Sequence, residues 1–128
     1  MKNPVERLTE RLIHGDSQKA ALVFSEKNRF YFTQFPASDG ALLVTAEEAY
    51  LLMDFRYEEA AHYKAKYCTV VGFDSLLGKL GELIQKHGIK QIYLETEQLS
   101  VAQARRFEAS FQKVGAEVVL DDTLDSAI

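Results

Sequence analysis

The sequence predicts an α/β fold with three layers, in which a mixed sheet of about six strands has helices on both faces. Two patterns support this prediction. Apolar runs over residues 41–44 and 49–53, separated by the polar-rich connection 45–48, are typical of a β-hairpin. From residue 68 onward, strand-like runs alternate with helical periodicity, which is typical of parallel strands joined by helices. A length of 128 residues fits one domain with its own core.

The chain before the hairpin is predicted to form one helix and one strand. Asn3 can cap a helix that has Pro4 at its first position, and Gly15 can end it. A strand over residues 20–25 follows. Residues 28–40 are rich in aromatic side chains and end in Ser-Asp-Gly, so we interpret them as a turn that leads into the hairpin.

The chain after the hairpin is predicted to alternate between helices and strands. The predicted elements are a partly buried helix over 57–67, a strand over 68–73, a helix that Asp74 caps and Gly88 ends, a strand over 89–94, a helix that begins after Thr96 or Ser100 and ends at Gly115, and a strand over 117–120. The acidic residues that follow, 121–128, are expected to form a turn-like, frayed tail.

Composition and charge argue against several classes of function. The net charge of -4, without clustered lysines and arginines, argues against a nucleic-acid partner. No apolar run approaches the roughly 18 residues of a membrane span, and no signal peptide is present, so we expect a cytoplasmic protein without a membrane partner. Cys68 lies in an apolar run and is interpreted as a buried side chain in a reducing compartment, rather than as a reactive thiol.

Side chains that could hold a metal ion are sparse. Glu58 and His62 are one helical turn apart and can form a pair, but two ligands make a weak site. Asp54, Glu95 and Asp121 each end a predicted strand, where open α/β sheets place their ligands. Such carboxylates either hold Mg²⁺ for phosphoryl transfer or cap the backbone that follows each strand, and we favour capping. We therefore predict no metal site and no catalytic residue in this chain.

One continuous stretch, residues 28–57, matches a family pattern. The pattern runs Asn-x-x-Tyr-Leu-Thr-Gly-Phe-x-x-Ser-x-Gly-x-Leu-Leu-Val-Thr and then Thr-Asp-x-Arg-Tyr, and it is met at Asn28, Tyr31, Thr33, Phe35, Ser38, Gly40, residues 42–45, Asp54, Arg56 and Tyr57. The chain departs from the pattern at Phe32, Gln34 and Met53. A glycine at position 34 would suit a turn with positive φ, which glutamine adopts only with strain. The stretch resembles the amino-terminal domain of the creatinase, prolidase and aminopeptidase P family.

This resemblance implies a fold for this chain and a separate domain that carries the catalysis. The implied fold is the α/β/α architecture of ribonuclease H-like type over residues 1–120, with 121–128 leading toward a catalytic domain that lies outside this chain. In the family, that second domain is a metallopeptidase that uses Mn²⁺, Co²⁺ or Zn²⁺ to hydrolyse the peptide bond before proline. The chain would then be the non-catalytic amino-terminal domain of an Xaa-Pro dipeptidase or aminopeptidase P, with no cofactor of its own.

The resemblance also implies partners and site residues. The expected partners are the carboxy-terminal catalytic domain, a second subunit of a homodimer and, in the full enzyme, proline-containing peptides. Because relatives use the aromatic loop at the rim of the active site, the resemblance implies entrance or interface roles for Phe35, Pro36, Ser38, Asp39 and Arg56. The Phe35 side chain either packs inward or, as we favour, lines the entrance.

Alternatives to these readings stay open. For Arg56 we favour a structural role, an ion pair with Asp54 that fixes the hairpin exit and caps the helix, because residues two apart on an extended segment point to the same side. The whole chain can also be a stand-alone interaction module with the same fold and no peptidase activity. A metal-dependent phosphoryl-transfer enzyme that uses the strand-end carboxylates is a more distant alternative.

Overall fold

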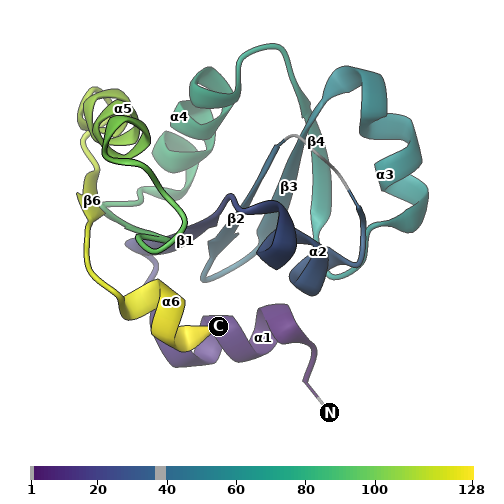
Figure 1. Ribbon diagram of the computed structural model, residues 1–128, viewed down its shortest axis with the longest axis horizontal. Helices are drawn as coiled ribbons and strands as arrows, with labels where there is room; N and C mark the ends of the chain where they lie inside the picture. Colours follow the sequence, from purple (N-terminus) through teal and green to yellow (C-terminus); the bar gives the residue numbers. More distant parts are fainter. Residues whose placement is uncertain (1, 37–39) are drawn as a thin grey trace.

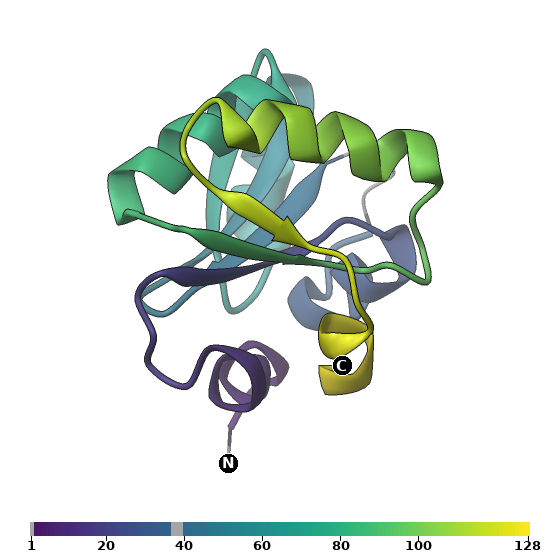
Figure 2. The same cartoon turned by 90° about the vertical axis from the view of Figure 1, so that its left-hand side faces the viewer.

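The computed structural model of the protein describes residues 2–36 and 40–128. Within these residues, six strands form one sheet in the order β4-β3-β2-β1-β5-β6. Helices α1, α2, α3 and α6 contribute to the core on one face, and α4 and α5 pack on the other, which gives three layers (Figures 1 and 2). The predicted three-layer α/β fold with a mixed, six-stranded sheet is confirmed.

The amino-terminal helix begins and ends as predicted, with one local difference. Helix α1 (Pro4–Leu8) starts with a capping box in which Asn3 and Glu6 bond to each other's backbone N–H groups. It continues as a π-helical segment, η1 (Thr9–Ile13). The run ends at two residues with positive φ, His14 and Gly15, which is the usual way for a helix to stop.

The interpretation of residues 28–40 as a turn is wrong, because residues 28–33 belong to a helix. Strand β1 (Lys19–Val23) is followed by helix α2 (Glu26–Thr33). The hydroxyl of Ser25, expected at the end of the strand, instead caps the helix. Phe32 lies in the core, and Gln34 ends the helix with a φ of 58°. The positive φ that the family pattern suggested at position 34 is therefore present.

The predicted hairpin is confirmed. Strands β2 (Ala41–Thr45) and β3 (Ala49–Asp54) pair in antiparallel fashion, and their residues are buried up to Met53. Gly40 precedes β2 with a φ of 115°, and a Cβ atom at this position would lie 2.2 Å from the carbonyl oxygen of Leu52. Only glycine tolerates both the conformation and the close approach.

The helices and strands predicted after the hairpin are present, with differences at their ends. They are α3 (Glu58–Lys64), β4 (Thr69–Phe73), α4 (Leu76–His87), β5 (Gln91–Leu94), α5 (Val101–Gln112) and β6 (Glu117–Val119). Two further elements, the 3-10 turn η2 (Phe55–Tyr57) and the helix α6 (Thr123–Ala127), are additional to the prediction. Ser75, rather than Asp74, caps α4, and Ser100 is the cap of α5. The expected burial of α3 is limited to Ala61.

The expectation of a frayed, turn-like tail after residue 120 is also wrong. Residues 123–127 form α6, whose Leu124 is fully buried in the same core cluster as α1. Arg11 donates a hydrogen bond to the carbonyl oxygen of Ala127, which fastens α6 to η1. The division between residues 1–120 and 121–128 stays a prediction, although the last segment packs as part of this core.

The sheet is parallel except at β2. Strand β1 pairs in parallel with β5, β3 with β4, and β5 with β6, whereas β2 is antiparallel to both of its neighbours. The carboxyl ends of five strands therefore meet at one edge, where α/β proteins place functional groups. Within the part of the chain that the structure describes, no helix is long and apolar enough to cross a membrane.

Candidate functional site

The loop that follows α2 contains four of the five predicted site residues. Phe35 is only 8% exposed and belongs to the core cluster between the sheet and α1. The favoured outward position of its side chain is therefore wrong. Pro36, the next residue, is exposed. Ser38 and Asp39 lie outside the described residues, and the functional roles of all four stay predictions.

Arg56, the fifth predicted site residue, pairs with Asp54 at the end of β3. The guanidinium Nε lies 3.0 Å from one carboxylate oxygen, and Nη2 lies 3.2 Å from the other. The backbone N–H of Arg56 donates to the same carboxylate at 3.0 Å. The Arg56 side chain lowers the pKa of Asp54, and the backbone hydrogen bond adds to that effect. The structural alternative for this pair, an ion pair that caps the hairpin exit, is thus confirmed.

Glu95 occupies the centre of a polar network at the carboxyl end of β5. Its carboxylate is fully buried and accepts hydrogen bonds from the backbone N–H groups of Phe24 and Ser25 at 2.5 and 2.8 Å. The other oxygen accepts from the Ser25 hydroxyl at 2.7 Å and from the Asn28 amide at 2.6 Å. Four donors thus compensate for the burial of one carboxylate.

The three strand-end carboxylates do not form a common site. Strands β2 and β1 lie between the strand of Asp54 and that of Glu95, a separation of about 14 Å at ordinary strand spacing. Thr123 lowers the pKa of the Asp121 carboxyl through a hydrogen bond from its side chain and a second one from its backbone N–H. Glu58 pairs only locally with His62, at 3.1 Å. Among residues 2–36 and 40–128, no three metal-ligating side chains are grouped.

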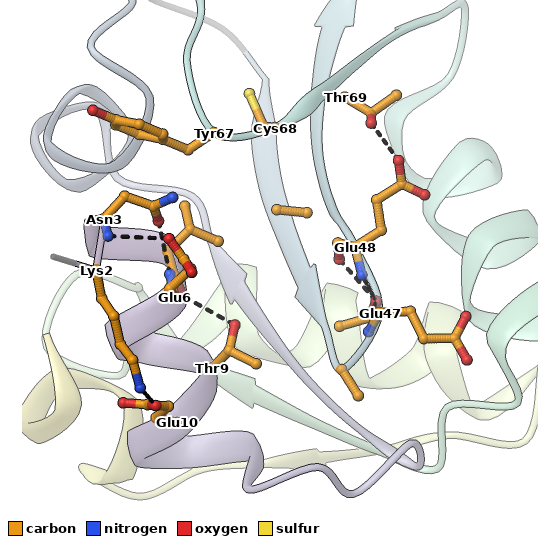
Figure 3. Close-up of a pocket in the computed structure, with 14 residues that line it drawn as sticks. Lys2, Asn3, Glu6, Thr9, Glu10, Glu47, Glu48, Tyr67, Cys68 and Thr69 are labelled. Carbon is orange, nitrogen blue, oxygen red and sulfur yellow. Dashed lines mark hydrogen bonds and ion pairs between the residues drawn. The ribbon is translucent and has the colours of Figure 1, made fainter.

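A hollow of the described surface lies between α1 and the hairpin turn (Figure 3). Its volume is about 600 Å³. Asn3 and Tyr67 lie on one side of the opening, and Glu48 and Thr69 on the other (Figure 3). Val5 and two alanines contribute apolar lining. Sequence reasoning missed this hollow, although the polar connection 45–48 beside a charged first helix was a usable signal.

Electrostatics within this hollow are dominated by carboxylates. Lys2 forms an ion pair with Glu10, and the Thr69 hydroxyl donates to Glu48, both visible in Figure 3. The hydrogen bond from Thr69 lowers the pKa of Glu48. Cys68 lines the same hollow, and burial raises the pKa of its thiol to about 11. This cysteine is therefore a poor nucleophile at neutral pH, as the sequence predicts, but its side chain is half-buried rather than fully buried.

A second feature that sequence reasoning missed joins β3 to the end of α4. The Tyr50 hydroxyl lies 2.7 Å from Nε2 of His87, and the two rings are tilted against each other with centroids 5.5 Å apart. Burial raises the pKa of the Tyr50 hydroxyl. Because both side chains are packed between elements, this contact holds α4 on the sheet rather than presenting a reactive pair.

Comparison with known families identifies the domain type that these features belong to. Residues 5–124 match the family model described as the Creatinase/Prolidase N-terminal domain. A protein of Mycoplasma genitalium named for Xaa-Pro aminopeptidase activity is 30% identical over 89 residues. This match covers 70% of the chain but 25% of that relative. The chain therefore spans about a quarter of the length of the curated relatives that it matches.

Solved structures show the same fold at low sequence identity. The N-terminal domain of the cytoplasmic peptidase PepQ from Mycobacterium tuberculosis superimposes with a TM-score of 0.81 at 24% identity, covering 99% of this chain and 100% of that one. An Xaa-Pro dipeptidase from Bacillus anthracis gives a TM-score of 0.79 at 20% identity, covering 96% of this chain and 34% of that one. An aminopeptidase P from Streptococcus thermophilus gives a TM-score of 0.81 at 18% identity, covering 97% of this chain and 94% of that one.

Proposed function

Because the chain belongs to the creatinase/prolidase N-terminal domain family, we propose that it is the non-catalytic amino-terminal domain of a cytoplasmic Xaa-Pro dipeptidase or aminopeptidase. One observation carries the proposal: the chain covers a complete solved N-terminal domain of this type, but only about a third or a quarter of longer relatives. The domain's work in this proposal is to shape the substrate entrance and to make dimer contacts.

The chemistry itself is assigned to the carboxy-terminal domain, the first partner of this one. In this proposal, the carboxy-terminal domain hydrolyses the peptide bond before proline and binds the Mn²⁺, Co²⁺ or Zn²⁺ that this reaction needs. The environment of the strand-end carboxylates supports this assignment. Asp54 and Asp121 are engaged with an arginine and with backbone N–H groups, and Glu95 has four donors of its own.

The proposed entrance lies at the carboxyl edge of the sheet. Strand β2 begins and β3 ends at this edge, with Ala41 opposite Leu52. The exposed Pro36 and the Arg56 side chain, which is 63% exposed, are the described residues that suit contact with a peptide or a neighbouring domain. Arg56 keeps its donors oriented through Asp54, which favours recognition of a carboxylate, such as the end of a proline-containing dipeptide.

The proposal is tested by comparing the isolated chain with the native gene product. We expect the 128-residue chain to unfold cooperatively and to show no turnover of an Xaa-Pro dipeptide in added Mn²⁺. We expect the native product to hydrolyse it, with kcat/KM lowered about tenfold by Arg56→Ala and unchanged by the surface control Lys79→Ala. Turnover by the pure chain, or a native product without turnover, would contradict the proposal.

A further inference from the structure

Two buried side chains of opposite charge lie beside the junction between β1 and α2. Arg29, on α2, is 3% exposed, and Glu95, after β5, is fully buried. They are the two charged side chains that are buried among residues 2–36 and 40–128. Burial of a charge is costly unless hydrogen bonds compensate for it. The hydrogen bonds of both side chains converge on the backbone of Phe24 and Ser25.

The two charges hold the peptide group between Phe24 and Ser25 at both of its polar ends. Nε of Arg29 donates a hydrogen bond to the Phe24 carbonyl oxygen at 3.1 Å, and the Ser25 N–H donates to the Glu95 carboxylate at 2.8 Å. The C=O and N–H of a trans peptide point in opposite directions. The cation and the anion therefore polarise this peptide group in the same sense, which strengthens both hydrogen bonds.

The Arg29 guanidinium also lies close to the start of β2. Its Nη1 atom is 3.5 Å from the position that a Cβ atom would occupy on Gly40. Phe24 directly follows β1 and Gly40 directly precedes β2, and these two strands pair with Val23 opposite Leu42. Arg29 therefore lies where the chain leaves the sheet to form α2 and where it returns. A planar guanidinium can lie along both points, whereas a compact ammonium cannot.

Buried hydrogen bonds connect Arg29 with the loop after α2. The Arg29 carbonyl oxygen accepts a hydrogen bond from the Thr33 hydroxyl at 2.8 Å, and that hydroxyl accepts one from the Phe35 N–H at 3.3 Å. Phe35 directly precedes the exposed Pro36, which lies at the proposed entrance. Because α2 has only eight residues, the placement of its start determines the placement of Pro36.

We propose that Arg29 is a positioning residue for the substrate entrance. Together with Glu95 it fixes the start of α2, and through Thr33 it fixes the place of Pro36. Arg29 is too buried to touch a peptide, so contact with the peptide belongs to the exposed Pro36 and Arg56. The family pattern leaves position 29 unspecified, so the resemblance does not imply this role. The inference rests on the proposed function, because the entrance is part of it.

Two buried threonines provide a matched pair for the test. Thr33 is fully buried, and Thr45 is 3% exposed. The Thr45 hydroxyl donates to the carbonyl oxygen of Glu48, at the end of β2 that is far from Gly40. Valine replaces either threonine with nearly the same shape but without the hydroxyl. Thr33→Val therefore breaks the link to the loop after α2, and Thr45→Val removes a comparable hydroxyl at the opposite edge of the sheet.

Amide hydrogen exchange in the 128-residue chain tests the positioning without reference to catalysis. Leu43, at the centre of β2, is fully buried, so exchange of its N–H reports global unfolding. We expect Arg29→Lys to accelerate exchange of the Phe35 N–H by a factor about ten times larger than that for Leu43, because lysine keeps the charge but loses the planar fork. Thr45→Val should accelerate both by the same factor.

Kinetics of the native gene product test the consequence for the entrance. We expect Arg29→Lys and Thr33→Val each to raise KM for an Xaa-Pro dipeptide about five- to tenfold and to keep kcat within about twofold, because a displaced entrance weakens binding without altering the chemical step. Thr45→Val should change neither constant. Thermal unfolding establishes that each variant is folded at the assay temperature. A loss of stability alone would reduce the amount of active enzyme, and hence the apparent kcat, rather than raise KM.

A double-mutant cycle with Pro36→Ala tests whether Arg29 acts through the entrance. In the Pro36→Ala background, Arg29→Lys should raise KM by less than about twofold, because both substitutions disturb the same site. Effects on KM that multiply would overturn the inference, since Arg29 would then act independently of Pro36.

Two further results would overturn the inference. One is an Arg29→Lys variant in which KM and the exchange of Phe35 are unchanged, and the other is a Thr45→Val variant in which KM rises equally. If Arg29→Lys does not fold, Thr33→Val measured against Thr45→Val decides the question. A native product without turnover even when Arg29 is present refutes the proposed function. Turnover with the same KM in Arg29→Lys and Thr33→Val refutes only the positioning role.

Discussion

Asn28 and Glu95 are separated by 67 residues in the sequence, yet the Asn28 amide donates a hydrogen bond to the Glu95 carboxylate at 2.6 Å. The same carboxylate binds the backbone N–H and the hydroxyl of Ser25, the cap of α2. The start of α2 is therefore fastened to the end of β5. A negative charge at a helix amino terminus also interacts favourably with the helix dipole.

Glu95→Gln should destabilise the protein by about 3 kcal/mol, because the amide replaces one acceptor oxygen with a donor that faces other donors in a buried site. Urea unfolding measures the loss. Glu97→Gln, at an exposed position two residues along the chain, is the matched control and should change stability by less than about 0.5 kcal/mol. Equal effects of the two substitutions would show that the network contributes nothing.

Phe35→Ala should cost about 3 to 5 kcal/mol of unfolding free energy, as expected for removal of a large core side chain. Phe30→Ala, which truncates a phenylalanine that is 51% exposed on α2, should cost less than about 1 kcal/mol. Chemical denaturation of the isolated chain compares the two. A small loss at Phe35 would mean that its side chain leaves the core in solution.

Gln34→Gly should stabilise the protein by about 0.5 to 1 kcal/mol. Gln34 ends α2 at a φ of 58°, a conformation that costs an ordinary residue roughly 1 to 2 kcal/mol, and glycine loses part of this gain to its greater freedom when unfolded. Lys27→Gly, in the first turn of the same helix, should instead destabilise by about 0.5 to 1 kcal/mol. Thermal unfolding that ranks the two variants the other way would contradict this account.

Arg56→Ala should raise the pKa of Asp54 toward its ordinary value of 3.8, because the Arg56 side chain is the main cause of its lowering. Because the pKa of Asp54 is lowered in the folded state, the ion pair stabilises the folded protein at pH values above the ordinary pKa of 3.8. This stabilisation is lost as the pH falls through the lowered pKa. Carboxyl NMR titration measures the shift. Asp121, whose lowering comes from Thr123, should titrate unchanged.

Cys68 should react slowly with a thiol reagent in the folded protein. Burial raises its pKa from 9.0 to about 11, which reduces the thiolate fraction at pH 8 about a hundredfold. We expect the native protein to be modified at least tenfold more slowly than the same chain in denaturing urea. A native rate close to the denatured one would show that the thiol is more accessible than its burial indicates.

Most of the fold could be predicted because its elements are marked by local chemistry. The hairpin has a polar connection between two apolar runs, and Gly88 and Gly115 each carry the positive φ that ends a helix. The first helix has its cap and proline where the pattern placed them. These signals act within a few residues, so they can be recognised without knowledge of the partners that pack around them.

The two missed helices have weaker local signals, although Ser25 does cap α2. Helix α2 contains two phenylalanines, a tyrosine and a threonine, which are mediocre helix formers, and it is held by contacts from Glu95 and by its buried Phe32. Helix α6 has five residues and an acidic composition, and Leu124 anchors it. Long-range contacts of this kind cannot be read from neighbouring residues. The pattern therefore located the loop after α2 but misjudged the direction of Phe35.

The position of β1 within the sheet also determines how the molecule could be divided. One edge of β1 pairs with β2, and the other pairs with β5, whose residues lie some seventy positions later. Gly88 is an exposed residue with open space around it, so the backbone could be cut after it. The fragment 1–88 would then have an unpaired edge on β1, and the fragment 89–128 would have β5 and β6 without the strand β1 on which β5 pairs. Neither piece is complete without the other. The domain is thus suited to a split-protein reporter, in which recovery of the fold signals that the two pieces have met.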